Sequence, residues 1–144
     1  MRELRTEIQI SAPIDQVWQA LTDFDHWKDW NPIVKQASGS ASLGSKLNIT
    51  ISGEDCKEMS YQPHVLEVNP PKIFRWRATM LAGFIFTNDR VFELKEKNGG
   101  TEFTHKEEFS GLMVPMCWKK MNQFVLPMLE KMNKALKDKL EASS

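Results

Sequence analysis

A change of hydrophobic period at Gly111 constrains the fold of this 144-residue chain more than any other feature. Between Ile33 and Gly111 apolar residues recur at every second position, which is typical of half-buried strands. After Gly111 they recur at three and four residues, the spacing of one face of an α-helix. This spacing predicts a long amphipathic helix from Pro115 to Glu141, kinked at Pro127 because proline removes a backbone hydrogen bond.

The first thirty residues predict one strand and two short helices. Residues 4–10 alternate between apolar and polar or charged side chains, with the small Thr6 at one of the inward positions, as a half-buried strand does. Ser11-Ala12-Pro13 breaks this strand, and helical spacing follows over residues 14–21. A second short helix is predicted over residues 23–30, because Asn31-Pro32 ends it.

About six strands then precede the long helix, and the turn Asn98-Gly99-Gly100 predicts a hairpin before the last of them. With no internal repeat or linker, the sequence predicts a single α+β domain over residues 1–144. Its curved antiparallel sheet has helices on one face. One helix cannot cover six twisted strands uniformly, so a space for a small apolar ligand is expected between sheet and helix.

Composition excludes several classes of protein. The 19 basic and 19 acidic residues cancel, which argues against nucleic acid as a partner. The longest apolar run, residues 80–86, is too short to span a bilayer, and the N-terminus lacks the apolar stretch of a signal peptide. Cys56 and Cys117 lie outside any CxxC spacing and are interpreted as reduced thiols. We therefore expect a cytoplasmic protein without stable membrane insertion.

Three stretches carry a resemblance to a known superfamily. The opening EIQISAPIDQVWQALTDFDHWKDWNP resembles the start of the START-like, or SRPBCC, superfamily, which includes the birch-pollen-allergen-like proteins. The stretches GTEFTHKEEFSGL and MNKALKDKLE are similar to its bacterial polyketide cyclase/dehydrase-type members. The resemblance implies a helix-grip fold, in which a seven-stranded antiparallel sheet wraps around the C-terminal helix and encloses a mostly apolar cavity. The superfamily includes lipid carriers, cyclases, hormone receptors and chaperone activators.

Polar residues on inward faces are the candidates for chemistry. In the last strand His105 and Glu107 share the face marked by phenylalanines, and in the preceding strand Asn88 and Arg90 do the same. A buried ionisable group must be paired or hydrated. One interpretation is an internal Arg90–Glu107 ion pair, with His105 and Asn88 satisfying the remaining bonds. The other is a polar end of the pocket that orients a ligand or, with His105 and Glu107 as catalytic candidates, transfers protons.

The predicted pocket wall is aromatic and rich in methionine. Met113, Met116, Met121, Met128 and Met132 crowd the final helix, and thioethers adapt to irregular apolar shapes; ordinary core packing is the alternative. Trp27 and Trp30 are expected either at the pocket mouth, by resemblance, or as a cap on the core. The predicted ligand-binding residues are Trp30, Ile49, Tyr61, Trp76, Phe86, Asn88, Arg90, His105, Glu107, Met121, Phe124 and Met128.

The preferred hypothesis is a non-catalytic carrier of a small hydrophobic molecule such as a lipid, polyketide or aromatic compound, acting as a monomer or weak homodimer. The alternatives are a cyclase or dehydratase and a chaperone-activator-type interaction module. The sequence shows no exposed apolar segment that would mark a partner site for the last of these. No metal or cofactor is expected, because the histidines and cysteines lack ligand spacing. The lysines of the final helix are interpreted as a solvated face, with weak attraction to a membrane surface as the alternative.

Overall fold

The architecture comes from a computed structural model, which describes residues 2–52, 58–80 and 85–142. A strand, β1, is followed by a helix, a 3₁₀ turn and a second short helix; seven further described strands and a long helix complete the chain. The bounds are β1 Arg2–Ile10, α1 Ile14–Thr22, η1 Phe24–His26, α2 Trp27–Trp30, β2 Val34–Ser38, β3 Asn48–Ser52, β4 Glu58–Tyr61, β5 His64–Asn69, β6 Ile73–Met80, β7 Phe86–Lys97, β8 Gly100–Ser110 and α3 Val114–Ala142.

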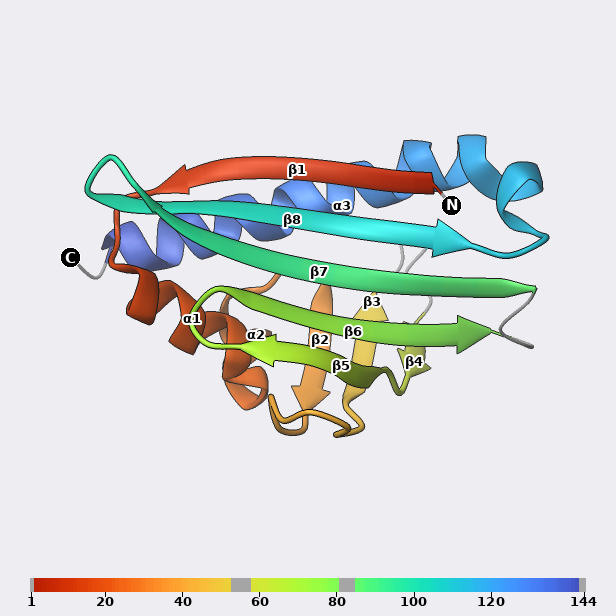
Figure 1. Ribbon diagram of the computed structural model, residues 1–144, viewed down its shortest axis with the longest axis horizontal. Helices are drawn as coiled ribbons and strands as arrows, with labels where there is room; N and C mark the ends of the chain where they lie inside the picture. Colours follow the sequence, from red (N-terminus) through yellow and green to blue (C-terminus); the bar gives the residue numbers. More distant parts are fainter. Residues whose placement is uncertain (1, 53–57, 81–84, 143–144) are drawn as a thin grey trace.

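The described strands pair in two antiparallel sheets. The larger has the order β1-β8-β7-β6-β5 and the smaller β2-β3-β4. In Figure 1 the larger sheet lies in front, α3 runs behind β1 and β8, and the smaller sheet lies behind β5 and β6. The predicted α+β class is therefore confirmed, with a curved antiparallel sheet, two short helices after the first strand and a long C-terminal helix on one face.

The strand count differs from the expectation, which is one strand, about six more after the short helices, and, by resemblance, seven in one sheet. Within residues 2–52, 58–80 and 85–142 there are eight strands in two hydrogen-bonded sheets. The difference arises at Gln62-Pro63. A single strand is expected over residues 61–68, but Tyr61 ends a separate strand, β4, and β5 begins only at His64. Proline has no N–H for a ladder, and the Pro63 carbonyl instead accepts a hydrogen bond from the N–H of Leu47 at 2.9 Å.

The predicted hairpin between the two longest strands is confirmed. Asn98 and Gly99 both adopt positive φ, at 54° and 77°, as a tight primed turn requires. This turn sets the register in which Arg90 lies opposite Glu107 and Phe92 opposite His105. Two features named from the sequence, Cys56 and most of the apolar run at 80–86, lie outside the described residues.

The long helix begins and ends within one residue of its predicted bounds and continues through Pro127. A bend at that proline remains a prediction. Burial differs between the two halves of α3. Leu129, Met132, Leu136 and Leu140 in the C-terminal half are buried, whereas, after the buried Val114 at the start, the inward positions of the N-terminal half are half-buried. These half-buried residues are Trp118, Met121, Phe124, Val125, Leu126 and Met128.

Two expectations about this helix are wrong. Met113 and Met116 are expected on the wall facing the sheet, but they are 36% and 84% exposed, because they lie in the turn before α3 and in its first turn, past the ends of β1 and β8 in Figure 1. The absence of an exposed apolar segment is also contradicted. Leu112, beside these methionines, is 73% exposed.

The closed end of the core is aromatic. Trp27 is fully buried and packs with Phe24, Trp76 and Phe92 at ring-centroid distances of 5.1, 5.9 and 6.2 Å. Trp27 therefore caps the core where the short helices meet the sheet, as one of the two interpretations expected. Close packing of this kind stabilises the end of the molecule away from the first turns of α3.

The last turns of α3 also hold the free edge of β1. The Lys137 ammonium donates to the backbone carbonyl of Gln9 at 2.8 Å. The N–H of Ser11 donates to the Glu141 carboxylate at 3.0 Å, and Lys137 pairs with Glu141. The helix therefore binds backbone groups that the neighbouring strand β8 does not use.

Candidate functional site

The inner face of β7 and β8 carries a charged cluster. Arg90 Nη2 and Glu107 Oε2 form an ion pair at 3.1 Å, and Asn88 Nδ2 donates to Glu107 Oε1 at 2.6 Å. The side chains of Arg90 and Glu107 are only 11% and 6% exposed. The hairpin register produces this cluster, because Arg90 and Glu107 are direct cross-strand partners and Asn88 precedes Arg90 by two residues on the same face.

Tyr61 and Trp76 surround the Arg90 guanidinium. The Arg90 guanidinium carbon lies 5.7 Å from the Trp76 ring centroid, within the range of a cation–π contact. Burial would lower the pKa of Arg90, but the charge of Glu107, the proximity of Tyr61 and the Glu107 hydrogen bond together raise this pKa. Burial raises the pKa of Tyr61; the positive charge of Arg90 opposes this rise, and the negative charge of Glu107 adds to it. The cluster therefore holds a paired charge and a neutral phenol.

His105 belongs to a second network, which links the sheet to α3. The Thr6 hydroxyl donates to the His105 carbonyl at 3.0 Å and accepts from Asn133 Nδ2 at 2.7 Å. The remaining amide oxygen of Asn133 lies 2.9 Å from His105 Nδ1. Because an amide oxygen only accepts, this bonding pattern assigns the imidazole proton to Nδ1 and leaves Nε2 as an acceptor.

The surroundings of His105 keep its imidazole neutral. The ring stacks on Phe92 and Phe103, with centroid distances of 4.7 and 5.3 Å. Burial and the positive charge of Arg90 lower the pKa of His105 well below its ordinary value, and the Asn133 hydrogen bond opposes this only in part. The site therefore contains a neutral, buried imidazole one row away from the ion pair.

Several buried polar atoms of this region have no hydrogen-bond partner among the described residues. They are Trp76 Nε1, Arg90 Nε and His105 Nε2, with Asn31 Nδ2 at the end of α2. Leaving such an atom unpaired costs about 1–3 kcal/mol. The three on the sheet offer two donors and one acceptor on neighbouring strands, so the inner face keeps hydrogen-bonding capacity beyond its own pairs.

The structure brings together five of the residues named from the sequence and separates others. Tyr61, Trp76, Asn88, Arg90 and Glu107 surround one another. The interpretation of an internal Arg90–Glu107 pair completed by Asn88 is confirmed, but the part given to His105 is wrong, because His105 bonds to Asn133.

The other named residues lie in different surroundings. Phe86, Met121, Phe124 and Met128 are half-buried, and Ile49 is buried in the core. Trp30 lines a shallow surface groove of about 240 Å³ together with Asp23, His26, Asp29, Ala20 and Lys139. A second groove, of about 370 Å³ between β1 and α3, reaches Thr6 and Asn133.

Asn133 and Thr6 are functional candidates that sequence reasoning missed. Both sit on stripes that the periodicity marks as buried: Asn133 lies four residues after Leu129, and Thr6 lies between Leu4 and Ile8. The signal that could have identified them was a polar residue among the buried apolar positions of a helix or strand.

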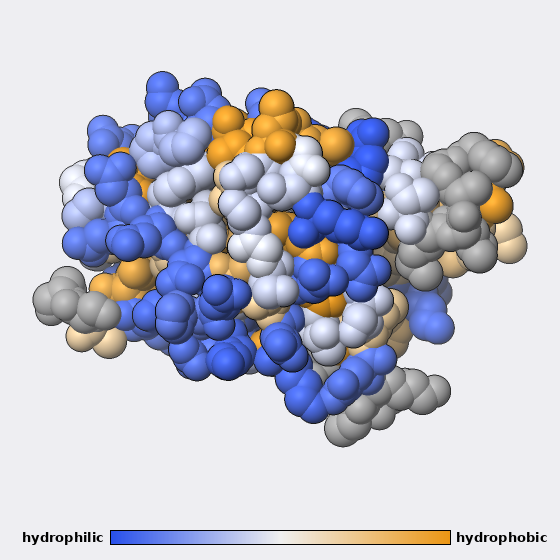
Figure 2. Space-filling model, turned by 90° about the horizontal axis from the view of Figure 1, so that it is seen from below, coloured by the Kyte–Doolittle hydropathy of each residue, from blue (hydrophilic) through white to orange (hydrophobic). Residues whose placement is uncertain are grey.

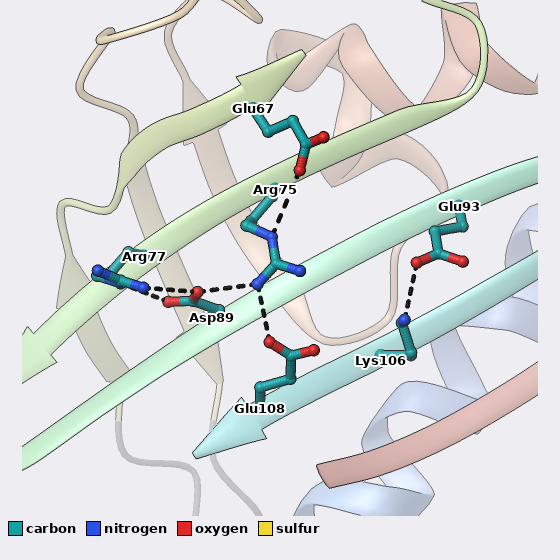
Figure 3. Close-up of polar contacts among 7 residues, drawn as sticks. All are labelled: Glu67, Arg75, Arg77, Asp89, Glu93, Lys106 and Glu108. Atoms are coloured by element: carbon teal, nitrogen blue, oxygen red, sulfur yellow. Dashed lines mark hydrogen bonds and ion pairs between the residues drawn. The ribbon is translucent and has the colours of Figure 1, made fainter. Parts of the chain in front are cut away.

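A network of charges on the outer face of the sheet was also missed. Arg75 bonds Asp89 at 3.0 Å and Glu108 at 2.8 Å, and Arg77 bonds Asp89 at 2.7 Å. Figure 3 shows this row crossing β6, β7 and β8, with Glu67 beside Arg75 and a separate Lys106–Glu93 pair. Asp89 is only 5% exposed, because the arginine side chains cover it. Alternating charges opposite one another on adjacent strands were the signal.

Two other kinds of site find no support in the described residues. None of the described helices is both long and apolar enough to cross a membrane. Within the same residues, no three His, Cys, Asp or Glu side chains gather as a metal site would require. Cys117 is a free, half-buried thiol.

Solved structures share this fold at low sequence identity. The di-domain aromatase/cyclase StfQ of the steffimycin biosynthetic pathway aligns with a TM-score of 0.81 and 9% identity over 98% of this chain and 51% of that one. The protein TTHA0849 from Thermus thermophilus aligns at 0.79 and 16%, covering 99% of both chains. Ara h 8.0201 aligns at 0.70 and 12%, covering 98% of both. At these identities the likeness establishes the fold, and the expected helix-grip arrangement is confirmed.

Sequence comparison adds a partial relative and a family. Oxopyrrolidines biosynthesis cluster protein O of Penicillium oxalicum is 32% identical over 78 residues, and the match spans 43% of this chain and 39% of that protein. The family model described as polyketide cyclase / dehydrase and lipid transport matches residues 1–141. Since that match covers nearly every residue, the chain belongs to the polyketide cyclase / dehydrase and lipid transport family.

Proposed function

We propose that this protein binds a small, largely apolar molecule between the inner face of β7 and β8 and the N-terminal half of α3. The observation that carries the proposal is the difference in burial along α3. Inward side chains beyond Leu129 are closely packed, whereas Met121, Phe124 and Met128 remain half-buried. Inward apolar side chains are normally covered closely, so half-buried apolar side chains on an inner face favour a ligand site.

The charged cluster forms the polar end of the proposed site. Glu107 cancels the charge of Arg90, so the site does not require an anionic ligand, and the unpaired Arg90 Nε favours an acceptor oxygen on the ligand. Burial of apolar surface provides the affinity, at roughly 25 cal/mol per Å². The polar contact sets the orientation of the ligand in the site.

Binding without catalysis is favoured by the state of the two candidate proton-transfer groups. Both oxygens of Glu107 are already bonded, one to Arg90 and one to Asn88. The lowered pKa of His105 makes its imidazole a weak base, and its Nδ1 is held by Asn133. A cyclase or dehydratase remains the second candidate, favoured by the family description and by the unpaired Nε2 of His105.

The experiment tests whether a bulky side chain placed on α3 blocks the proposed site. Met121→Trp places a large ring on the half-buried inward position, whereas Gln123→Trp adds the same ring on an exposed position of the same helix. We expect the neutral probe N-phenyl-1-naphthylamine to bind the wild type and Gln123→Trp equally, and Met121→Trp at least roughly tenfold more weakly. Probe fluorescence measures the affinity, and thermal melting shows that each variant is folded.

Two results would overturn the proposal. The first is a wild-type protein that carries no small molecule in denaturing mass spectrometry and shows no saturable binding of the probe. The second is equal binding by the two tryptophan variants. Turnover of a polyketide substrate that is lost in His105→Asn while probe affinity is kept would instead favour the enzyme.

A further inference from the structure

Three exposed apolar side chains form a cluster where α3 begins. Leu112 and Met116 are 73% and 84% exposed and Met113 is 36% exposed; together we call them the apolar tip. The other large apolar side chains exposed in the described residues, Leu43, Met59 and Leu66, belong to three separate segments. In Figure 2 hydrophobic surface shows at the right-hand end, where α3 begins in Figure 1. Single exposed apolar residues are ordinary, but a contiguous group marks an interaction surface.

The backbone holds the apolar tip in a fixed position. Gly111 has φ 119°, and a Cβ atom there would lie 2.3 Å from the carbonyl oxygen of Ile85. The same carbonyl accepts a hydrogen bond from the N–H of Met113 at 3.1 Å. The turn is therefore pressed against the start of β7, and Leu112 projects outward from it. A fixed presentation lowers the conformational entropy lost on docking.

Positive charge lies one helical turn behind the apolar tip. Lys119 and Lys120 follow Met116 at i+3 and i+4, so the three exposed side chains share one face of α3. The Arg2 guanidinium stacks on Trp118 at 5.2 Å, adding a third cation at this end. From Phe109 to Leu129 the sequence has no acidic residue. The net charge of the whole chain is zero, whereas the segment 109–129 carries the charges of Lys119 and Lys120 alone, so this segment is basic.

From this arrangement we infer that the apolar tip docks onto the surface of an anionic lipid bilayer. Leu112 and Met116 enter the boundary between headgroups and acyl chains, and Lys119 and Lys120 lie at the level of the headgroup charges. A second copy of the chain fits less well, because two basic tips repel each other. Three side chains also bury much less than the roughly 800 Å² per partner of a stable interface. The docking is peripheral and needs no membrane-spanning helix.

Docking in this orientation brings the proposed ligand site toward the lipid. Met121 and Phe124 follow the apolar tip within the next two turns of α3 and are half-buried on its inward side. A largely apolar ligand would then pass between bilayer and protein over a short path. The docking itself does not depend on the proposed function, since the unliganded protein carries every residue that takes part.

The test is sedimentation of the unliganded protein with vesicles. We expect binding to vesicles containing about one third phosphatidylserine, weaker binding to phosphatidylcholine alone, and a decline between about 50 and about 300 mM NaCl. The double variant Leu112→Asp with Met116→Asp should bind the anionic vesicles at least roughly tenfold more weakly. Leu43→Asp, which changes an equally exposed leucine elsewhere, should bind as the wild type does.

A second pair of variants tests the charges. Lys119→Glu with Lys120→Glu should abolish the preference for anionic vesicles, whereas Lys95→Glu with Lys131→Glu, the same charge change at exposed lysines elsewhere, should retain it. The inference is overturned if the wild type does not sediment with anionic vesicles, or if tip variants and controls bind alike. Self-association that is lost in Leu112→Asp with Met116→Asp would assign the apolar tip to a second copy instead. Failure to bind vesicles would not affect the proposed ligand site, which is tested separately by binding of N-phenyl-1-naphthylamine.

Discussion

The amide oxygen of Asn133 on α3 accepts a hydrogen bond from Nδ1 of His105 on β8, at 2.9 Å. This contact joins the closing helix to the strand that carries the candidate site. Because Asn133 also donates to Thr6 on β1, one amide connects three elements of the inner layer. The contact fixes the tautomer of the imidazole, and its loss would leave buried polar atoms on both sides.

The first prediction concerns pH. The pKa of His105 in the folded protein lies well below the ordinary value of 6.5, which applies to the unfolded chain. Below that pH the unfolded chain binds a proton that the folded protein does not, so the free energy of unfolding falls as pH falls. The slope of this free energy against pH approaches about 1.4 kcal/mol per pH unit. The stability contributed by the neutral His105 is fully present above the pKa of the unfolded chain. Urea unfolding between about pH 7.5 and about pH 5.5 measures the slope.

Two histidine variants separate this effect from others. His105→Asn keeps a donor for Asn133 and should reduce the slope, although the lost ring lowers stability at every pH. His26→Asn should leave the slope at least as steep, because the hydrogen bond to Asp23 raises the pKa of the exposed His26, and a raised pKa acts in the opposite direction to His105. An unchanged slope in His105→Asn would contradict the assignment.

The second prediction concerns the buried ion pair. Arg90→Met leaves Glu107 as a buried charge with only Asn88 beside it, and should cost about 3–5 kcal/mol of unfolding free energy. Adding Glu107→Leu removes the unpaired charge and should recover part of that loss. A double-mutant cycle by urea unfolding measures the coupling. Additive losses would show that the two side chains act independently.

The third prediction concerns Gly111. Gly111→Ala must adopt a positive φ and also bring its Cβ into the Ile85 carbonyl, so we expect a loss of about 2–4 kcal/mol. Gly44→Ala is the matched control, with φ 82° and nothing within 4 Å of the added atom. It should cost about 1 kcal/mol from the backbone conformation alone. Thermal or urea unfolding measures both losses of stability. Equal losses in the two variants would contradict the role given to the contact with the Ile85 carbonyl.

The fourth prediction concerns the outer face of the sheet. Asp89→Asn weakens its bonds to both Arg75 and Arg77 in a largely covered position, and should cost about 2–4 kcal/mol. Asp138→Asn, which breaks the exposed pair with Lys134 on α3, should cost only a small fraction of that, because solvent screens the pair. Urea unfolding of both variants measures the two losses of unfolding free energy. Comparing them tests whether burial determines how much each ion pair contributes to stability.

The sequence predicted helices and strands better than it predicted which side chains contact one another. Periodicity located α3 to within one residue at each end and placed His105 and Glu107 on the inner face, because side-chain direction follows the local backbone. The Asn98-Gly99 turn set the register, so Arg90 and Glu107 could be expected to meet. The division of the sheet at Pro63 was not foreseen, since proline is tolerated at strand ends as well as at breaks.

The partner of His105 could not be found from strand patterns. Asn133 reaches it from a helix 28 residues away in the sequence, and which helical residue faces which strand depends on how α3 crosses the sheet. The exposure of Met116 depends on the same tertiary relationship, because the first turn of α3 extends past the sheet. Periodicity identifies a buried face but does not tell where along the helix the covering layer stops.

The bond from Lys137 to the Gln9 carbonyl has a further consequence, for aggregation. An edge strand with free backbone groups is a template on which another chain can add a strand. In this protein the final turns of α3 occupy part of that edge, through Lys137 at Gln9 and Glu141 at Ser11. A chain shortened before Lys137 would uncover the edge of β1, and molecules could then join strand to strand into fibrils.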